Sequence, residues 1–153
     1  MWFLPFDILK LKSDLNIDQI FDTLQEVIDP NGYAVIRLTP PPNHKPYRGS
    51  LSLNGFSITR WIHYKNPFLP IIIGKIISQG SNNTIFIKMF LNPFGLLIGI
   101  FLISLPFGWL DKQSLQTIAS VLIYIFLLFV YKAEAVYSMD FFRKIFEKIS
   151  LKI

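Results

Sequence analysis

Two long stretches without a charged residue dominate the second half of the chain. The charged residues that bound them are Lys88 and Asp111 for the first, and Lys112 and Lys132 for the second. Within these stretches, residues 94–110 and 113–131 are apolar and would form helices of about 25 and 28 Å. Each length nearly matches the hydrocarbon core of a bilayer. We therefore expect a membrane protein in which residues 92–133 form a two-helix transmembrane hairpin.

The connection between the two predicted helices is the short segment "DKQS", so the helices must be antiparallel neighbours. A buried helix pair in a water-soluble protein is the alternative. The other residues, about one hundred, are too few to cover two helices that are apolar on every face. Gly95 and Gly99 form a G-x-x-x-G pair, which would allow another helix to approach closely.

Basic residues indicate how such a protein would be oriented. Those outside the connection are Lys75, Lys88, Lys132, Arg143, Lys144 and Lys148, whereas the connection contains Lys112 alone. Because lysine and arginine concentrate on the cytoplasmic side of membrane proteins, both termini are expected in the cytoplasm. The first residues, "MWFLPF", lack the basic region of a signal peptide and are interrupted by Pro5.

Residues 1–91 are expected to form a cytoplasmic α+β domain. The pattern predicts strands at 6–11, 33–38, 69–78 and 84–91, and a β-hairpin across 47–62. After the first strand, apolar residues recur at helical spacing from Ile17 to Ile28, and Asn16 with Gln19 forms the pattern of a capping box. The predicted domain is thus a mostly antiparallel sheet with one helix.

The last segment, residues 134–153, is predicted to be a separate amphipathic helix. Its apolar stripe consists of Phe141, Phe142, Ile145, Phe146, Ile149 and Ile153. This helix could cover a face of the sheet, or it could lie among the lipid headgroups with its lysines toward anionic lipid. The sequence leaves both placements open.

Arg60 is the one charged residue that the hairpin pattern places among apolar side chains. With a two-residue turn at Asn54-Gly55, Arg60 would lie opposite Gly49 on the apolar face. It could extend from the sheet margin into water or to lipid phosphate. If it is covered instead, it must meet a carboxylate, backbone carbonyls or an anionic ligand.

The segment that follows, "RWIHYKNPFLPIIIG", is rich in side chains that both stack and form hydrogen bonds. Arg60, Trp61, Tyr64 and Asn66 are our candidate ligand-binding residues, for a nucleotide or a lipid headgroup. From Tyr47 to about Trp109, the chain resembles a family of small uncharacterised bacterial membrane proteins with the pattern R-x-I-x-Y-x-N-x-F-x-P-x-I-x-G.

The positions that match this family are Gly49, Phe56, Arg60, Ile62, Tyr64, Asn66, Phe68, Pro70 and Gly74, and the pattern departs at Pro67. The resemblance implies a β-rich cytoplasmic domain followed by a transmembrane hairpin, in the inner membrane of a bacterial cell. It implies no activity.

Several classes of function are not expected. The chain has no cysteine, and its two histidines, His44 and His63, have no carboxylate pair at ligand spacing, so neither a metal site nor a catalytic nucleophile with its base is predicted. No cofactor is expected. The net charge of +5 fits the cytoplasmic flanks of membrane helices, so nucleic acid is not an expected partner.

Three functions remain. We prefer an accessory or structural membrane protein that binds a membrane-protein partner or forms a homo-oligomer. A ligand-sensing effector that oligomerises through its membrane segments ranks next. A transporter or pore subunit is third, because residues 94–110 and 113–131 contain no ionisable Asp, Glu, Lys, Arg or His.

Overall fold

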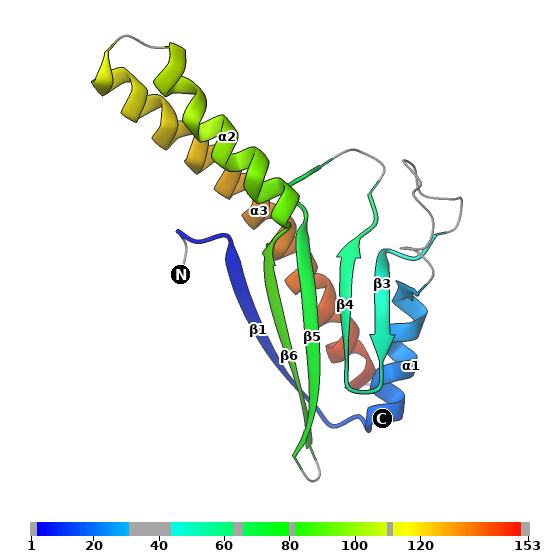
Figure 1. Cartoon of the computed structure of the whole chain (residues 1–153). Coiled ribbons are helices and arrows are strands. Elements are labelled where there is room, and N and C mark those ends of the chain that lie inside the picture. Colours follow the sequence, from blue (N-terminus) through cyan, green and yellow to red (C-terminus); the bar gives the residue numbers. More distant parts are fainter. Residues whose placement is uncertain (1–2, 31–43, 63–65, 80–81, 110–111, 151–153) are drawn as a thin grey trace.

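The computed structural model describes residues 3–30, 44–62, 66–79, 82–109 and 112–150. The elements, in chain order, are β1 (Phe6–Ser13), α1 (Ile17–Val27), β2 (Ile28–Asp29), β3 (Tyr47–Ser52), β4 (Gly55–Arg60), β5 (Pro70–Gln79), β6 (Asn82–Leu91), α2 (Pro93–Trp109) and α3 (Gln113–Ser150) (Figure 1). The predicted strand at 33–38 lies outside the described residues.

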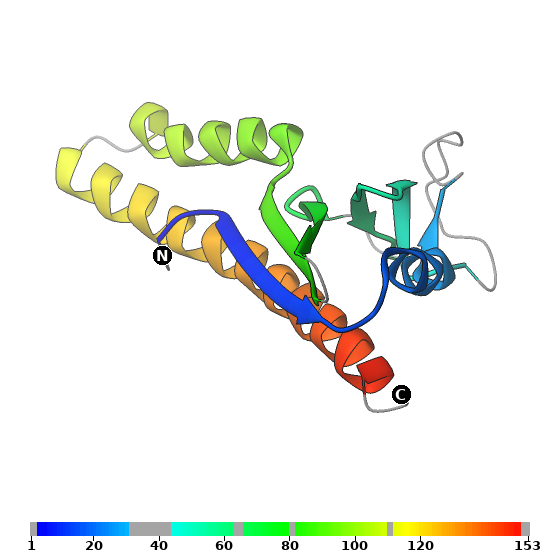
Figure 2. The same ribbon diagram turned by 90° about the horizontal axis from the view of Figure 1, so that it is seen from below.

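The strands form one sheet in the order β1-β6-β5-β4-β3-β2. All neighbours are antiparallel except β2 and β3, which are parallel. Helices α1 and α3 lie on the same side of this sheet, and no described helix covers its other side (Figure 2). We call these the covered face and the open face.

The capping box predicted at the start of α1 is confirmed. The Asn16 side chain accepts a hydrogen bond from the Gln19 backbone N–H at 2.8 Å, and the Gln19 side chain accepts one from the Asn16 N–H at 3.0 Å. The helix ends at Val27, earlier than the apolar pattern predicted, because Ile28 and Asp29 pair with β3 as the short strand β2.

The core lies between the covered face and the two helices. Ile20 and Leu24 of α1 are buried, as are Phe142 and Phe146 of α3. The C-terminal part of α3 therefore covers the sheet, which was one of the two placements that the sequence left open.

The predicted turn of the β3–β4 hairpin is wrong by one residue. The turn residues are Leu53 and Asn54, and Ser52 pairs with Gly55. A Cβ atom at Gly55 would lie 2.2 Å from the Gly74 carbonyl oxygen of β5. This glycine thus allows two strands to pair closely and is not needed for the turn.

The predicted two-helix transmembrane hairpin with a separate C-terminal amphipathic helix is also wrong. The second predicted span, 113–131, and the amphipathic helix, 134–153, are parts of one continuous helix of 38 residues, α3. No glycine or proline lies within α3, and residues 132–135, "KAEA", are good helix formers, so nothing stops the helix where the apolar stretch ends.

Only α3, among the described helices, is long and apolar enough to cross a membrane, and α2 is a shorter apolar helix. The two helices pack side by side and extend away from the sheet (Figure 1).

Candidate functional site

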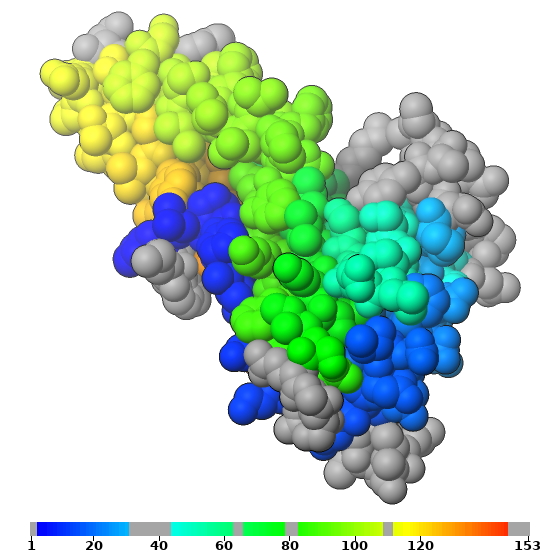
Figure 3. Space-filling model, turned by 60° about the horizontal axis from the view of Figure 1, so that its bottom comes forward, coloured from blue at the N-terminus to red at the C-terminus, as the bar shows by residue number. Residues whose placement is uncertain are grey.

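The apolar end of the molecule consists of α2 and residues 113–130 of α3, and it projects from the rest of the structure (Figure 3). Its exposed large side chains are Phe94, Leu96, Leu97, Ile100, Phe101, Leu105, Phe107, Leu115, Ile118, Val121, Leu122, Tyr124, Ile125, Phe126 and Phe129. Only 11% of the apolar 18-residue stretch of α3 is buried inside the molecule, whereas the core helix of a soluble protein is mostly buried.

Two ion pairs lie where α3 passes from the apolar end onto the sheet. Lys132 of α3 contacts both carboxylate oxygens of Asp7 in β1, at 2.8 and 2.9 Å. Two residues later, Glu134 contacts Arg60 of β4 at 2.6 Å. These junction pairs attach α3 to two separate strands of the sheet, at the first charged positions after the apolar stretch.

The environment of Arg60 answers the question raised by the sequence. Arg60 does lie on the apolar face, opposite Tyr47 and not opposite Gly49. Its side chain is 23% exposed, and that of Glu134 is 9% exposed. The guanidinium carbon also lies 3.8 Å from the centre of the Tyr137 ring. Arg60 is therefore partly covered and meets a carboxylate, which was one of the environments that the sequence left open.

Tyr47 and Ser138 are fully buried next to this pair. Neither hydroxyl makes a hydrogen bond within the described part of the chain. Burial raises the pKa of the Tyr47 phenol to about 12, and the nearby Ser138 hydroxyl and Arg60 charge oppose this rise only in part. Tyr47 is thus a neutral packing residue, in ring contact with Phe141 and Phe142.

Two of the other three candidate ligand-binding residues, Trp61 and Asn66, have contacts of their own and do not join Arg60. Trp61 is buried and contacts the His44 ring and the Arg48 guanidinium. Asn66 accepts a hydrogen bond from the Phe68 backbone N–H at 3.0 Å, which fixes a turn. Tyr64 lies outside the described residues. Asp7, Lys132 and Glu134 were not identified as site residues because each is a common charged residue far from its partner in sequence.

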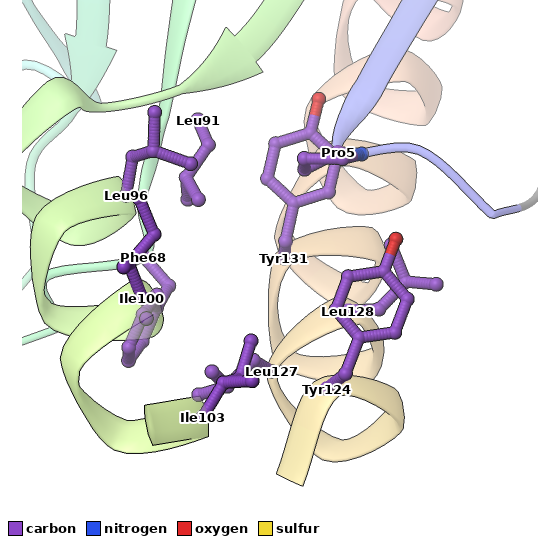
Figure 4. A pocket seen from close by; sticks show the side chains of 11 residues that line it. Pro5, Phe68, Leu91, Leu96, Ile100, Ile103, Tyr124, Leu127, Leu128 and Tyr131 are labelled. Carbon is purple, nitrogen blue, oxygen red and sulfur yellow. The ribbon is translucent and has the colours of Figure 1, made fainter. Parts of the chain in front are cut away.

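An apolar cavity of about 180 Å³ lies between α2, α3 and the sheet. Leu96, Ile100 and Ile103 point into it from α2, and Leu127 and Tyr131 line it from α3 (Figure 4). The Tyr131 hydroxyl is not available to a ligand there, because it donates a hydrogen bond to the Met89 carbonyl at 2.9 Å. Leu96 and Ile100 are also exposed at the surface, so this pocket is partly open, and its lining favours apolar groups.

The glycines of the predicted G-x-x-x-G pair have different neighbours. A Cβ at Gly95 would lie 2.2 Å from the Pro67 carbonyl oxygen, so this residue allows the connection before β5 to approach α2. A Cβ at Gly99 would lie 3.5 Å from a side-chain carbon of Leu127 in α3, which is an ordinary contact distance. Gly95 therefore serves contact with a loop, and only Gly99 faces a helix.

Comparison with known proteins gives no further indication of function. No protein-family model matches the chain, and no curated protein or solved structure is significantly similar to it. Among the described residues, no group of three or more His, Cys, Asp or Glu side chains could hold a metal ion.

Proposed function

We propose that this chain is an accessory membrane protein. Its apolar end would be embedded in lipid, and its sheet domain would bind a partner at the membrane surface. The observation that supports this proposal is the apolar end itself, which exposes large side chains along both helices and contains no charged residue in 93–109 or 113–131. In water such a surface would cause aggregation, whereas lipid covers it favourably.

The proposed orientation has the sheet in the cytoplasm. β1 near the N-terminus and the C-terminal part of α3 both belong to the sheet domain, so they would lie on the same side of the membrane. Lysine and arginine are abundant on that side, and only Lys112 lies at the opposite end of α2 and α3. In a bacterial cell, this arrangement would place the protein in the inner membrane.

The junction pairs favour an anchoring role over ligand sensing. The candidate sensor residue Arg60 is held by Glu134 and by the Tyr137 ring, so a ligand would have to displace both contacts. Lys132 is likewise paired, with the carboxylate of Asp7. The two pairs would keep the sheet in a fixed position relative to the embedded end, as a docking platform requires.

A matched pair of leucine substitutions tests the proposal. Leu122 in α3 and Leu53 in the β3–β4 turn are similarly exposed, at 61% and 53%. Leu122→Lys should reduce the membrane-bound fraction after alkaline extraction, since lysine near the middle of a spanning helix costs about 2.5–3.5 kcal/mol. Leu53→Lys should leave that fraction unchanged. Equal recovery of both variants in the membrane, or of both in the soluble fraction, contradicts the proposal.

The partner can be identified from the same membranes. Native mass spectrometry after mild detergent extraction should show a fixed ratio of this chain to another membrane protein, or a defined number of copies of the chain itself. A monomer with no bound protein, in wild-type membranes, contradicts the accessory role.

A further inference from the structure

The open face of the sheet is strongly basic. The register aligns Lys10, Phe86 and Lys75 in one row across β1, β6 and β5. The next row toward α2 contains Ile8, Lys88 and Ile73, and Lys12 lies on the same face beyond Lys10. All four lysines are exposed. Among the described strand positions of this face, the only acidic residue is Asp29 of β2, which lies beside Arg48 of β3 at the far edge from β1.

Polarity on the open face changes along the strands. The row nearest α2 contains only apolar residues in these three strands, Phe6, Phe90 and Ile71. The first lysine, Lys88, lies one row further on. About 17 Å of extended chain separate Lys88 from the start of α2. An apolar band followed by lysines is the order of side chains found where a protein passes from lipid to the headgroup region.

Acidic residues gather on the other side of the sheet. Those around α1 are Asp14, Asp18, Asp22 and Glu26, and all are exposed. Helix α1 lies on the covered face and away from the apolar end (Figures 1 and 2). The domain therefore has a positive face next to the apolar end and a negative face distant from it, so its charges favour one orientation at a negatively charged surface.

We infer that the open face rests on the anionic headgroups of the membrane in which the apolar end is embedded, with Lys10, Lys75 and Lys88 facing lipid phosphate. This inference depends on the proposed function, since it needs the apolar end to be in lipid. It adds the class of lipid and the surface that recognises it. A lysine close to an anionic surface strengthens binding by about fivefold, so the three lysines together favour contact by about 100-fold.

The absence of cysteine makes the test direct, because each single-cysteine variant carries one reactive thiol. Three variants report separate positions: Ile73→Cys on the open face, Asp22→Cys on α1 and Leu122→Cys in the apolar end. Each is placed in lipid nanodiscs of neutral lipid alone or with about one third anionic lipid. The rate of labelling by an uncharged, hydrophilic maleimide is measured, because a charged reagent would itself respond to the lipid.

We expect Ile73→Cys to react at least tenfold more slowly in anionic than in neutral nanodiscs, and Asp22→Cys to react equally fast in both. Salt at about 0.5 M should restore the rate at Ile73→Cys, since it screens charges beyond a few ångströms. Combining Ile73→Cys with Lys10→Gln, Lys75→Gln and Lys88→Gln should also restore the labelling rate in anionic nanodiscs.

Two results would contradict the inference but not the proposal that the apolar end is embedded in lipid. In both, Leu122→Cys remains protected. In the first, Ile73→Cys reacts at the same rate in both lipids, so the face does not contact the headgroups. In the second, Ile73→Cys is protected in both lipids whether or not the lysines are present, which means that a protein, such as a second copy, covers the face. Rapid labelling of Leu122→Cys in both lipids would instead refute the proposed function.

Discussion

Removing one member of the Arg60–Glu134 pair should destabilise the fold by an amount that depends on which member is removed. The carboxylate is the better covered of the two, at 9% exposed against 23% for the guanidinium. Arg60→Met therefore leaves a covered negative charge that has lost its guanidinium. Glu134→Gln leaves a positive charge that still contacts the Tyr137 ring and reaches water.

The distance of 2.6 Å between Nη1 and Oε2 sets the scale of these effects. At an effective dielectric constant of about 20, the attraction is about 6 kcal/mol, and desolvation of the two ions offsets most of it. We expect Arg60→Met to lower the free energy of unfolding by about 3 kcal/mol and Glu134→Gln to lower it by about 1.5 kcal/mol. The double variant Arg60→Met/Glu134→Leu should be within about 1 kcal/mol of wild type, because no covered charge remains.

The assay is equilibrium unfolding by urea in mild detergent, followed by circular dichroism, for both single variants and the double variant. Arg143→Met is the control. Its contact with Asp140 is 3.7 Å long and both side chains are half exposed, so its removal should change the free energy of unfolding by less than about 0.5 kcal/mol. The reasoning fails if Arg60→Met is as stable as wild type, or if Glu134→Gln is the more destabilising change.

Four further substitutions test other parts of the structure. Tyr47→Phe should not reduce stability at pH 7, because the hydroxyl makes no hydrogen bond within the described residues. Burial raises the Tyr47 pKa from 10.0 to about 12, so the folded state disfavours the phenolate and wild type should lose about 1.4 kcal/mol of stability through this group between pH 7 and pH 11. Tyr47→Phe should lose less, and unfolding at pH 7 and pH 11 compares the two proteins. Gly99→Ala should raise the melting temperature, because alanine stabilises a helix by about 0.5–1 kcal/mol relative to glycine. Gly95→Ala should lower the melting temperature, because its Cβ would lie too close to the Pro67 carbonyl oxygen. Tyr131→Phe should lower the free energy of unfolding by about 1 kcal/mol through loss of its bond to Met89, and an unchanged urea midpoint would argue against that bond.

Local patterns were sufficient to predict most of the sheet domain. The strands β1, β5 and β6 follow the predicted segments, and the Asn16 cap of α1 depends only on residues three apart. The face on which Arg60 lies was also predicted correctly. This prediction remained correct despite the error at the turn, because the partner of Arg60 changed by two positions, from Gly49 to Tyr47. A shift of two positions keeps each side chain on the same face of the sheet.

Features that depend on distant residues were not predictable in the same way. The turn register depends on the close approach of Gly55 to Gly74 in another strand. The partner of Arg60 is 74 residues away, and that of Lys132 is 125 residues away. The continuity of α3 was missed because the change from an apolar to an amphipathic pattern near Lys132 was interpreted as a boundary, although helix propensity is uninterrupted there.

The unbroken course of α3 has a mechanical consequence. At 1.5 Å per residue, the 20 residues after position 130 extend about 30 Å from the apolar end. When bilayer thickness changes, a spanning helix adjusts its tilt, and a change of about 10° would move the far end of this rod sideways by about 5 Å. Two ion pairs attach α3 to β1 and β4, so if α3 spans a bilayer as proposed, the whole domain would move with it. Membrane thickness and the position of the domain would then be linked without any hinge.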